Sequence, residues 1–384
     1  MSKRVWVLSA AVGAGHMRAA EAVTLALQQL DPTIEVVHRD VLEWASAGFR
    51  RVYGDAYLDL VHRAPHVLGY FYDRLDRSPG KGIQRGKLDD VRLFVEKMSM
   101  RPFVRAIRQS SADLIINTHF LSAEIVASLK RKGQLDIPHF TVTTDFETHR
   151  LWVNQPCERY FTATAEGAAY LHHWGVPMED VVVSGIPIDP VFARPKDKGA
   201  LMAQRQWPAN RPVLLQLAGG FGVGPMAQIL NGLTEIEVPC TILVVTGRNT
   251  KAKEQLERNA VARHHHLQII GFTKEMDEWL AMADIVVSKP GGLTTSETLA
   301  RGAVMAIVNP IPGQESRNSD YLLENGVAIK INNLATLPMK IEQLLHDPER
   351  LATMKKRSRL LGKPDAALTI AKQALNYLRS DRYK

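Results

Sequence analysis

Short apolar segments alternate with helical patterns twice along this chain, and a proline-rich stretch separates the two runs. Alternation of strand and helix is typical of a parallel sheet that carries helices on both faces. Residues 185–212 contain five prolines, which favours a linker. We therefore expect an α/β protein with two Rossmann-like, doubly wound domains, at residues 1–190 and 191–365. The expected strands lie at residues 5–9, 34–37, 114–117, 139–143, 159–162, 180–184, 213–217, 241–246, 267–270, 285–288 and 304–308.

Two further segments complete the expected organisation. Residues 366–378 show the spacing of an amphipathic helix, and we expect the C-terminal helix, residues 366–384, to pack back on the first domain. Residues 44–108 interrupt the alternation and are rich in aromatic, methionine and basic residues. We interpret them as a mostly helical insertion at the mouth of the first domain.

The net charge of +8 is unevenly distributed along the chain. Residues 49–108 hold 13 Lys/Arg against 7 Asp/Glu, and residues 340–384 hold 11 against 5. Basic segments favour anionic lipid, nucleic acid or phosphorylated substrates, although a solvated surface explains the excess equally well. Aromatic-interleaved basic motifs are lacking, so we expect no nucleic-acid partner. No run of about 18 apolar residues occurs, so we expect any membrane contact to be made at the surface.

Neither the cysteines nor the histidine cluster predicts a metal site. Cys157 and Cys240 are far apart and have no partner ligands nearby in sequence, which fits a reduced, cytoplasmic protein. The consecutive His264–His266 cannot easily all ligate one ion, and we interpret them as a surface loop.

A glycine turn follows the first apolar strand and places a histidine at the start of a helix. The turn reads Gly13-Ala14-Gly15-His16. The positive end of a helix disfavours imidazolium, so a histidine here is kept in the neutral, basic form. His16 is therefore a candidate general base. The alternative is a histidine that only caps the helix or contacts backbone.

A second glycine turn, far along the chain, offers backbone N–H groups to an anion. Gly291-Gly292-Leu293-Thr294 precedes an expected helix, an arrangement that suits a diphosphate. We place Glu297 in the first helical turn, where its carboxylate either binds two ribose hydroxyls or caps the helix. Gln314 and Glu315 follow a glycine in an expected polar loop, and side chains of this type bind sugar hydroxyls or remain solvated.

Two other positions are candidates for ligand contacts. The loop Gly219-Gly220-Phe221-Gly222 follows a strand, and its glycines allow either close approach to a phosphate or an ordinary turn. Asp145, His149 and Trp152 follow another strand, at the end where α/β folds bind ligands. Trp152 could bind an acyl chain, enter the interfacial zone of a membrane, or belong to the packed core.

These motifs, taken in order, resemble the monogalactosyldiacylglycerol synthase and processive diacylglycerol glucosyltransferase family. The resemblance covers nearly the whole chain, and its most specific part is the run from Lys289 to Glu297 with Pro312-Gly313-Gln314-Glu315 behind it. The family is related to the peptidoglycan glycosyltransferase that adds GlcNAc to lipid I. The motifs that carry the resemblance are Ala14-Gly15-His16, Thr144-Asp145, Gly185-Ile186-Pro187-Ile188, Gly219-Gly220-Phe221-Gly222, Val245-Thr246-Gly247-Arg248-Asn249, Gly271-Phe272-Thr273, Lys289-Pro290-Gly291-Gly292-Leu293-Thr294-Thr295-Ser296-Glu297 and Pro312-Gly313-Gln314-Glu315.

The resemblance implies a GT-B fold with two domains facing a central cleft and inverting chemistry. We expect no metal or cofactor, because backbone N–H groups and a helix start can stabilise the leaving diphosphate. The donor would be UDP-glucose or UDP-galactose, bound by the second domain. Glu297 resembles the ribose-binding carboxylate, and Gln314 and Glu315 match residues that face the hexose. The other implied donor-site positions are Gly219, Gly220, Arg248, Phe272, Gly292, Leu293 and Thr294.

The acceptor implied by the resemblance is diacylglycerol, bound by the first domain at the cytoplasmic face of the membrane. His16 resembles the catalytic base, and Gly15, Asp145, His149 and Trp152 match positions near the lipid. The implied partners are thus a UDP-sugar, diacylglycerol and an anionic lipid surface. Two alternatives stay open: a polyprenyl-linked acceptor of the peptidoglycan type, and a non-catalytic regulator that binds a nucleotide sugar.

Overall fold

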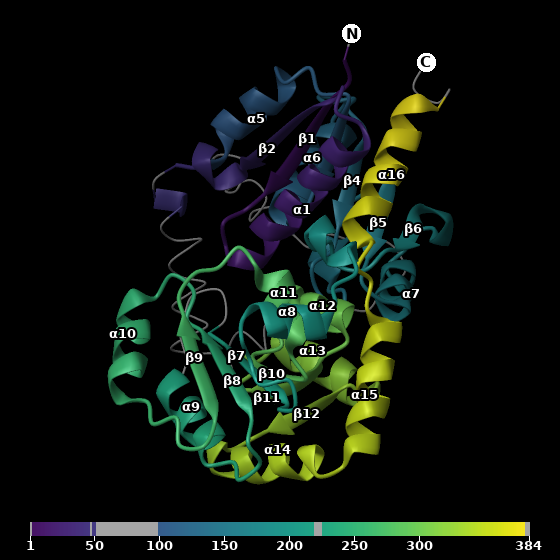
Figure 1. The fold of residues 1–384 in the computed structure, drawn as a ribbon. Coiled ribbons are helices and arrows are strands. Elements are labelled where there is room, and N and C mark those ends of the chain that lie inside the picture. The colour runs from purple at the N-terminus through teal and green to yellow at the C-terminus, as the bar shows by residue number, and fades with distance from the viewer. Residues whose placement is uncertain (1, 47, 51–98, 219–224, 381–384) are drawn as a thin grey trace. The chain divides into compact units, whose positions relative to one another are not determined.

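The computed structural model describes residues 2–46, 48–50, 99–218 and 225–380 (Figure 1). The chain divides into two compact units. The first unit comprises Met1–Pro190, Pro312–Gln314 and Asp365–Lys384, and the second comprises Val191–Ile311 and Glu315–Pro364. The expected helical insertion at 44–108, with its basic side chains, lies largely outside the described residues.

The first unit is built on a parallel sheet of six strands, in the order β2-β1-β3-β4-β5-β6. The chain adds β2 on one side of β1 and then reverses to add β3 on the other side. Ligands bind such sheets at the carboxyl ends of the strands, at the point of reversal. The strands are β1 (Arg4–Ser9), β2 (Glu35–Asp40), β3 (Leu114–Asn117), β4 (His139–Val142), β5 (Arg159–Thr162) and β6 (Val181–Val183).

Alternate side chains of β1 enter two different cores, as the period of a strand requires. Val5 and Val7 pack with helices α1 and α16, whereas Trp6 and Leu8 pack with α5 and α6. The C-terminal helix α16 thus covers the same face of the first sheet as α1 (Figure 1). The helices of this unit are α1 (Ala14–Leu30), α5 (Arg101–Arg108), α6 (Phe120–Arg131), α7 (Ala165–His173) and α16 (Ala366–Arg379), with short 3-10 helices at Val41–Trp44, Arg150–Trp152 and Met178–Asp180.

The second unit has its own parallel sheet of six strands, in the order β12-β11-β10-β7-β8-β9. Here the reversal lies between β7 and β10, which places the start of helix α12 at the switch point. The strands are β7 (Val213–Leu217), β8 (Thr241–Val245), β9 (His266–Ile270), β10 (Ile285–Ser288), β11 (Val304–Val308) and β12 (Ala328–Ile331). The helices are α8 (Lys198–Gln204), α9 (Met226–Thr234), α10 (Thr250–Asn259), α11 (Met276–Met282), α12 (Gly292–Arg301), α13 (Gln314–Glu324), α14 (Leu337–Leu345) and α15 (Pro348–Leu361), with 3-10 helices at Pro190–Ala193 and Leu334–Thr336.

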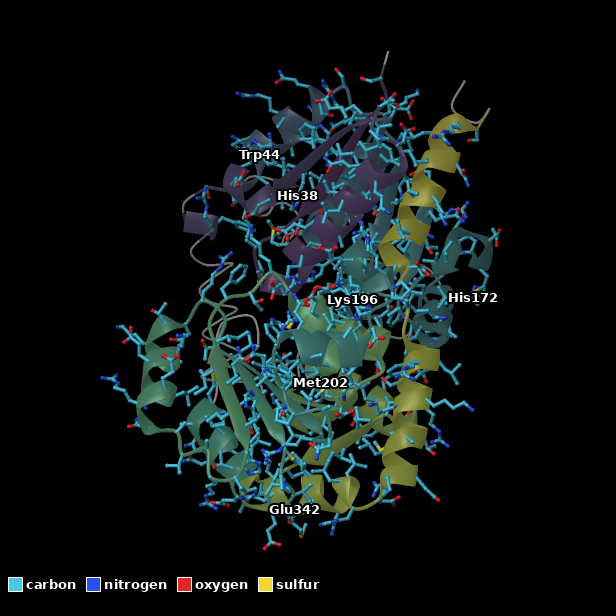
Figure 2. The ribbon with its side chains drawn as sticks, in the orientation of Figure 1. His38, Trp44, His172, Lys196, Met202 and Glu342 are labelled. Carbon is cyan, nitrogen blue, oxygen red and sulfur yellow. The ribbon has the colours of Figure 1, made fainter. Side chains whose placement is uncertain are left out.

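Ion pairs hold the beginning of the second unit to helix α11 and to the residue before β10. Lys196, which precedes α8 (Figure 2), lies 3.2 Å from Asp277 and 3.1 Å from Glu278. The buried Asp284 accepts from Lys198 at 2.6 Å and from Lys355 at 2.5 Å, and from the backbone N–H of Val213. Asp284 directly precedes β10. Its ion pairs therefore hold Lys198 of α8 and Lys355 of α15 to the end of the sheet opposite the switch point.

The prediction of two doubly wound α/β halves is confirmed by these two parallel sheets. Among the helices that the structure describes, none is long and apolar enough to cross a membrane. Cys157 and Cys240 are free thiols. The expectation for the histidine cluster is wrong in part: only His264 is exposed, whereas His265 is buried and accepts from the Cys240 backbone N–H, and His266 opens β9.

Candidate active site

The first turn of α1 carries His16 at the carboxyl edge of the first sheet. Gly13 precedes the helix with φ of 97°, a conformation that side chains other than glycine's rarely adopt. In the described part of the chain no side chain caps this helix, and its first turn holds no acidic residue. The uncompensated N–H groups therefore act on His16, the third helical residue, and disfavour imidazolium.

The contacts of the His16 ring fix its tautomer. Its Nδ1 lies 3.0 Å from the Thr118 carbonyl oxygen and 2.9 Å from Thr144 Oγ1. A carbonyl oxygen can only accept, so Nδ1 carries the hydrogen and Nε2 keeps its lone pair. The two sequence interpretations of His16 are therefore compatible, because the backbone contact leaves Nε2 available to accept a proton.

Burial lowers the pKa of His16 below its ordinary value. Desolvation by the surrounding side chains is the largest cause, and the charge of His149 acts in the same direction. The Asp145 carboxylate and the hydrogen bond to Thr118 oppose it. The edge of the His119 ring also packs on His16, with centroids 4.5 Å apart. At neutral pH the imidazole is thus an uncharged base.

The Asp145 carboxylate acts on this base through its charge, which raises the pKa of His16. The carboxylate is buried, accepts from Trp152 Nε1 at 3.1 Å and lies 3.6 Å from His149 Nε2. Desolvation raises its pKa, but the neighbouring His149, the charge of His16 and the hydrogen bond from Trp152 outweigh this, so the pKa of Asp145 lies below its usual range. The carboxylate therefore stays ionised at neutral pH.

Trp152 is fully buried, which favours the packed-core interpretation over insertion into a membrane interface. Its ring lies against Phe120, His149 and His16, with centroids 5.8, 5.8 and 6.1 Å apart. His149 is buried as well. Trp152 thus contacts both Asp145 and His16, and His149 lies beside Asp145. Gly15, which directly precedes His16 in the first turn of α1, is half-buried.

Sequence reasoning assigned no role to three residues that the fold brings to His16. Thr118 and Thr144 bind its ring, and the ring of His119 packs on it. His119 caps α6 by accepting from the Leu121 N–H, and burial lowers its pKa well below the ordinary value. The signal was present, because Thr118-His119-Phe120 directly follows the apolar segment 114–117 at the same sheet edge.

The second candidate site is the start of α12, at the switch point of the second sheet. The N-cap is Gly291, and in the described residues no side chain satisfies the first N–H groups of the helix. Gly292, Leu293 and Thr294 form the first turn, which holds no acidic residue. Such a helix start attracts an anion through its N–H groups and its dipole.

Glu297 lies deeper in α12 than the sequence analysis expected. It is the sixth residue of the helix, beyond the first turn, because α12 already begins at Gly292. A carboxylate at this depth cannot cap the helix, so the capping alternative is wrong. Glu297 is also buried, at 3% exposure.

Gln314 and Glu315 open helix α13, and the expectation of a polar loop is wrong. Glu315 accepts from the Ile311 N–H at 2.7 Å, which holds the preceding turn against the helix. Burial raises the pKa of Glu315, although this hydrogen bond and the charge of Lys289 oppose the rise. A half-buried carboxyl with a raised pKa is suited to hydroxyl ligands.

Two other donor-site candidates, Arg248 and Phe272, follow strands β8 and β9 of the second sheet. The Arg248 guanidinium lies over the Phe272 ring, 5.3 Å from its centroid, and Phe272 is 61% exposed. An exposed aromatic face of this kind can stack on a base. Gly219 and Gly220 lie outside the described residues. The sequence analysis missed Asn318, which donates to the Pro290 carbonyl at 2.9 Å and so ties α13 to the turn before α12.

The comparison with solved structures identifies the class of fold. The crystal structure of Acinetobacter baumannii MurG matches with a TM-score of 0.62 at 19% identity, over 97% of this chain and 99% of that chain. Together with the two doubly wound sheets, this likeness defines a GT-B fold.

Comparison with protein families identifies the family. The family "Monogalactosyldiacylglycerol (MGDG) synthase" matches residues 16–188, and "Glycosyltransferase family 28 C-terminal domain" matches residues 226–370. A processive diacylglycerol beta-glucosyltransferase of Bacillus cereus (strain AH187) is 31% identical over 68% of this chain and 67% of its own length. The protein of the same name from Bacillus pumilus (strain SAFR-032) is 29% identical over 96% and 94%. The chain belongs to the monogalactosyldiacylglycerol synthase and processive diacylglycerol glucosyltransferase family.

Proposed function

We propose that this protein transfers a hexose from a UDP-sugar to diacylglycerol at a membrane surface, with inversion at the anomeric carbon. The observation that carries the proposal is the tautomer of His16. Its Nδ1 hydrogen is held by the Thr118 carbonyl, which leaves a neutral Nε2 to take a proton. The names of the relatives, processive diacylglycerol beta-glucosyltransferases, support this donor and acceptor chemistry.

The first unit would bind the acceptor. An alcohol is a poor nucleophile until a base takes its proton during attack. His16 Nε2 accepts that proton while the lipid oxygen forms a bond to the anomeric carbon. The bond from this carbon to the diphosphate oxygen breaks at the opposite face, and UDP leaves with the electron pair. The ionised Asp145 stabilises the imidazolium that results, because its charge raises the pKa of His16. Gly15 lies next to the base in sequence, and the buried His149 and Trp152 would support Asp145 from within the proposed acceptor site.

The second unit would bind the donor. The start of α12, with Gly292, Leu293 and Thr294, stabilises the charge that develops on the leaving diphosphate. Glu297 would accept hydrogen bonds from the ribose, and Gln314 and Glu315 would contact the hexose. Phe272 with Arg248 suits the uracil side, and Gly219 and Gly220 belong to the same proposed site. This chemistry needs no metal or cofactor.

The acceptor is a membrane lipid, so the protein must reach a bilayer. We propose peripheral attachment at the cytoplasmic face of the cell membrane, through the basic segment between Arg50 and Arg108 and anionic lipid. The chain offers 13 Lys/Arg over residues 49–108, enough to give a measurable attraction to an anionic surface.

Product analysis tests the proposal directly. Purified protein is incubated with diacylglycerol in anionic vesicles and with labelled UDP-glucose or UDP-galactose in separate reactions. We expect a labelled β-glycosyldiacylglycerol from one donor. A product formed only when a polyprenyl-linked acceptor replaces diacylglycerol would contradict the acceptor. Binding of UDP-sugar without any transfer would contradict the enzymatic proposal and favour a nucleotide-sugar-binding regulator.

A further inference from the structure

Two acceptors share the single hydrogen of His16 Nδ1, and they come from two neighbouring strands. The Thr118 carbonyl follows β3 and lies 3.0 Å away, and Thr144 Oγ1 follows β4 and lies 2.9 Å away. One acceptor is sufficient to select the tautomer. Two acceptors at an angle also restrict rotation of the ring about its bond to Cβ, and so restrict the direction in which Nε2 points.

We infer that the Thr144 hydroxyl is a positioning group for His16, which acts with the Thr118 carbonyl to hold the ring and to keep the lone pair on Nε2. The inference rests on the proposed function, in which His16 is the base. Thr144 is itself held firmly, because it is buried and the preceding Thr143 donates its backbone N–H to the Phe161 carbonyl at 2.9 Å.

A neutral acceptor suits this position better than a carboxylate. A carboxylate bonded directly to Nδ1 would raise the pKa of the imidazole, so a larger fraction of the base would be protonated at neutral pH. A hydroxyl adds direction without adding charge. The negative charge that acts on His16 comes from Asp145. The other titratable groups that face His16 are His119 and His149. His16 also lies in the first turn of α1, at the positive end of the helix.

Removal of the hydroxyl has two separable effects. In Thr144→Val the ring loses one acceptor, so imidazolium is less favoured and the pKa of His16 falls further. The acid limb of the pH profile of kcat/KM then moves to lower pH. Turnover also falls, by about 2- to 13-fold for one lost hydrogen bond of ordinary strength, because the ring spends less time in the productive orientation. KM for the lipid changes little.

The experiment compares three variants of the full chain. Thr144→Val removes the hydroxyl, and Thr144→Ser restores it. The matched control is Thr24→Val, which makes the same chemical change on α1, where the hydroxyl donates to the Ala20 carbonyl. For each variant we measure kcat, KM, the pH profile and the melting temperature. Nitrogen-15 spectra of labelled histidine, assigned with His16→Gln, report separately on which ring nitrogen carries the hydrogen.

The expected pattern is a loss of kcat in Thr144→Val with a displaced acid limb, recovery in Thr144→Ser and no change in Thr24→Val. The nitrogen spectrum of Thr144→Val should still show the Nδ1–H tautomer, because the Thr118 carbonyl remains, but the His16 nitrogens should titrate at lower pH than in the parent protein. A Thr144→Val protein with unchanged kcat, pH profile and nitrogen spectrum would overturn the inference. If His16→Ala keeps near-normal turnover, the proposed base itself fails, and the two failures are thereby distinguished.

Discussion

The starts of α1 and α12 are built alike and are suited to opposite tasks. Each helix follows a glycine at the switch point of a doubly wound sheet, and within the described chain each begins without a side-chain cap. In α1 an imidazole occupies the first turn, where the helix keeps it uncharged. In α12 the first turn carries only small and neutral side chains, which leaves the positive end to an external anion.

The two helix starts share a backbone arrangement, and the groups around each one determine what it can do. The first unit gathers groups that follow two adjacent strands, β3 and β4, around His16, and the carboxylate among them is Asp145. The second unit supplies its positive potential through backbone N–H groups, and its carboxylates lie elsewhere: Glu297 is in the second helical turn, and Glu315 opens a different helix. Proton transfer needs the first arrangement, and anion binding needs the second.

The mutation with the largest expected effect should impair catalysis at the start of α1 and leave UDP binding at the start of α12 unchanged. His16→Ala should lower kcat by about 10²–10⁴-fold, the usual contribution of a general base. UDP affinity, measured by calorimetry, should stay the same because the mutation leaves α12 intact. The exposed His173→Ala on α7 serves as a control and should keep full turnover. Near-normal activity of His16→Ala would remove His16 from the mechanism.

Membrane attachment should belong to the first unit. Replacing Arg85, Lys87, Arg92 and Lys97 with Gln should weaken binding to anionic vesicles by up to about 4 kcal/mol at low salt, since each basic residue near the surface contributes about 1 kcal/mol. The effect should shrink as salt screens the charges. The control removes two exposed basic side chains of α10, with Lys251→Gln and Arg258→Gln. Sedimentation that depends on the control pair instead would assign docking to the second unit.

Glu297 tests the donor half alone. Glu297→Ala should weaken UDP binding by about 1.5–3 kcal/mol, the cost of lost hydrogen bonds to a charged group. Turnover at saturating donor should fall less than in His16→Ala. Glu254→Ala, an exposed carboxylate of α10, is the control, and melting temperatures show whether each variant is folded. Unchanged UDP affinity in folded Glu297→Ala would exclude Glu297 from the donor site.

The electrostatics of the first unit predict a pH effect with a definite sign. Burial lowers the pKa of His16, so activity should be lost only as pH falls below the ordinary range of histidine. Asp145 opposes this shift, and Asp145→Asn should therefore move the acid limb of kcat/KM to still lower pH. A limb that moves upward in Asp145→Asn would show that another group controls the profile.

The smallest expected effect is that of chelation. An Asp-x-Asp pair, which many nucleotide-sugar enzymes use to hold a divalent ion, is absent from the sequence. The start of α12 should stabilise the leaving diphosphate instead, so turnover should survive EDTA. Mg²⁺ can still stimulate by screening anionic lipid. Complete loss in EDTA, restored by one specific metal, would contradict this account of the leaving group.

The fold was predictable because the spacing of apolar residues and the positions of glycine and proline turns are sufficient to indicate a doubly wound sheet. Of the strands that the structure describes, all but β12 (Ala328–Ile331) were expected from the sequence, as were the glycine turns and the proline-rich linker. Helix boundaries were less accurate: the sequence analysis began α12 at Thr295, three residues late, and this error placed Glu297 in the first turn. The loop expected at Gln314 is helical, because Glu315 bonds to the Ile311 N–H and closes the turn before it.

The contacts of His16 were not predictable to the same degree. Thr118, His119 and Thr144 lie more than 100 residues away along the chain, and only the order of strands β1, β3 and β4 brings them together. Strand order depends on which sheet edges pair, and no local pattern encodes that. A rule that collects polar residues after each apolar strand would have found them.

The return of α16 to the first sheet has a consequence for how the protein is made. Side chains of α16, among them Ile370 and Leu378, fill the same core as Val5 and Val7 of β1. The ribosome synthesises β1 first and α16 only after the entire second unit. Until α16 emerges, the first sheet presents an open apolar face, so the second unit can complete its fold earlier than the first. A nascent chain halted before residue 366 should therefore recruit holdase chaperones through its amino-terminal half.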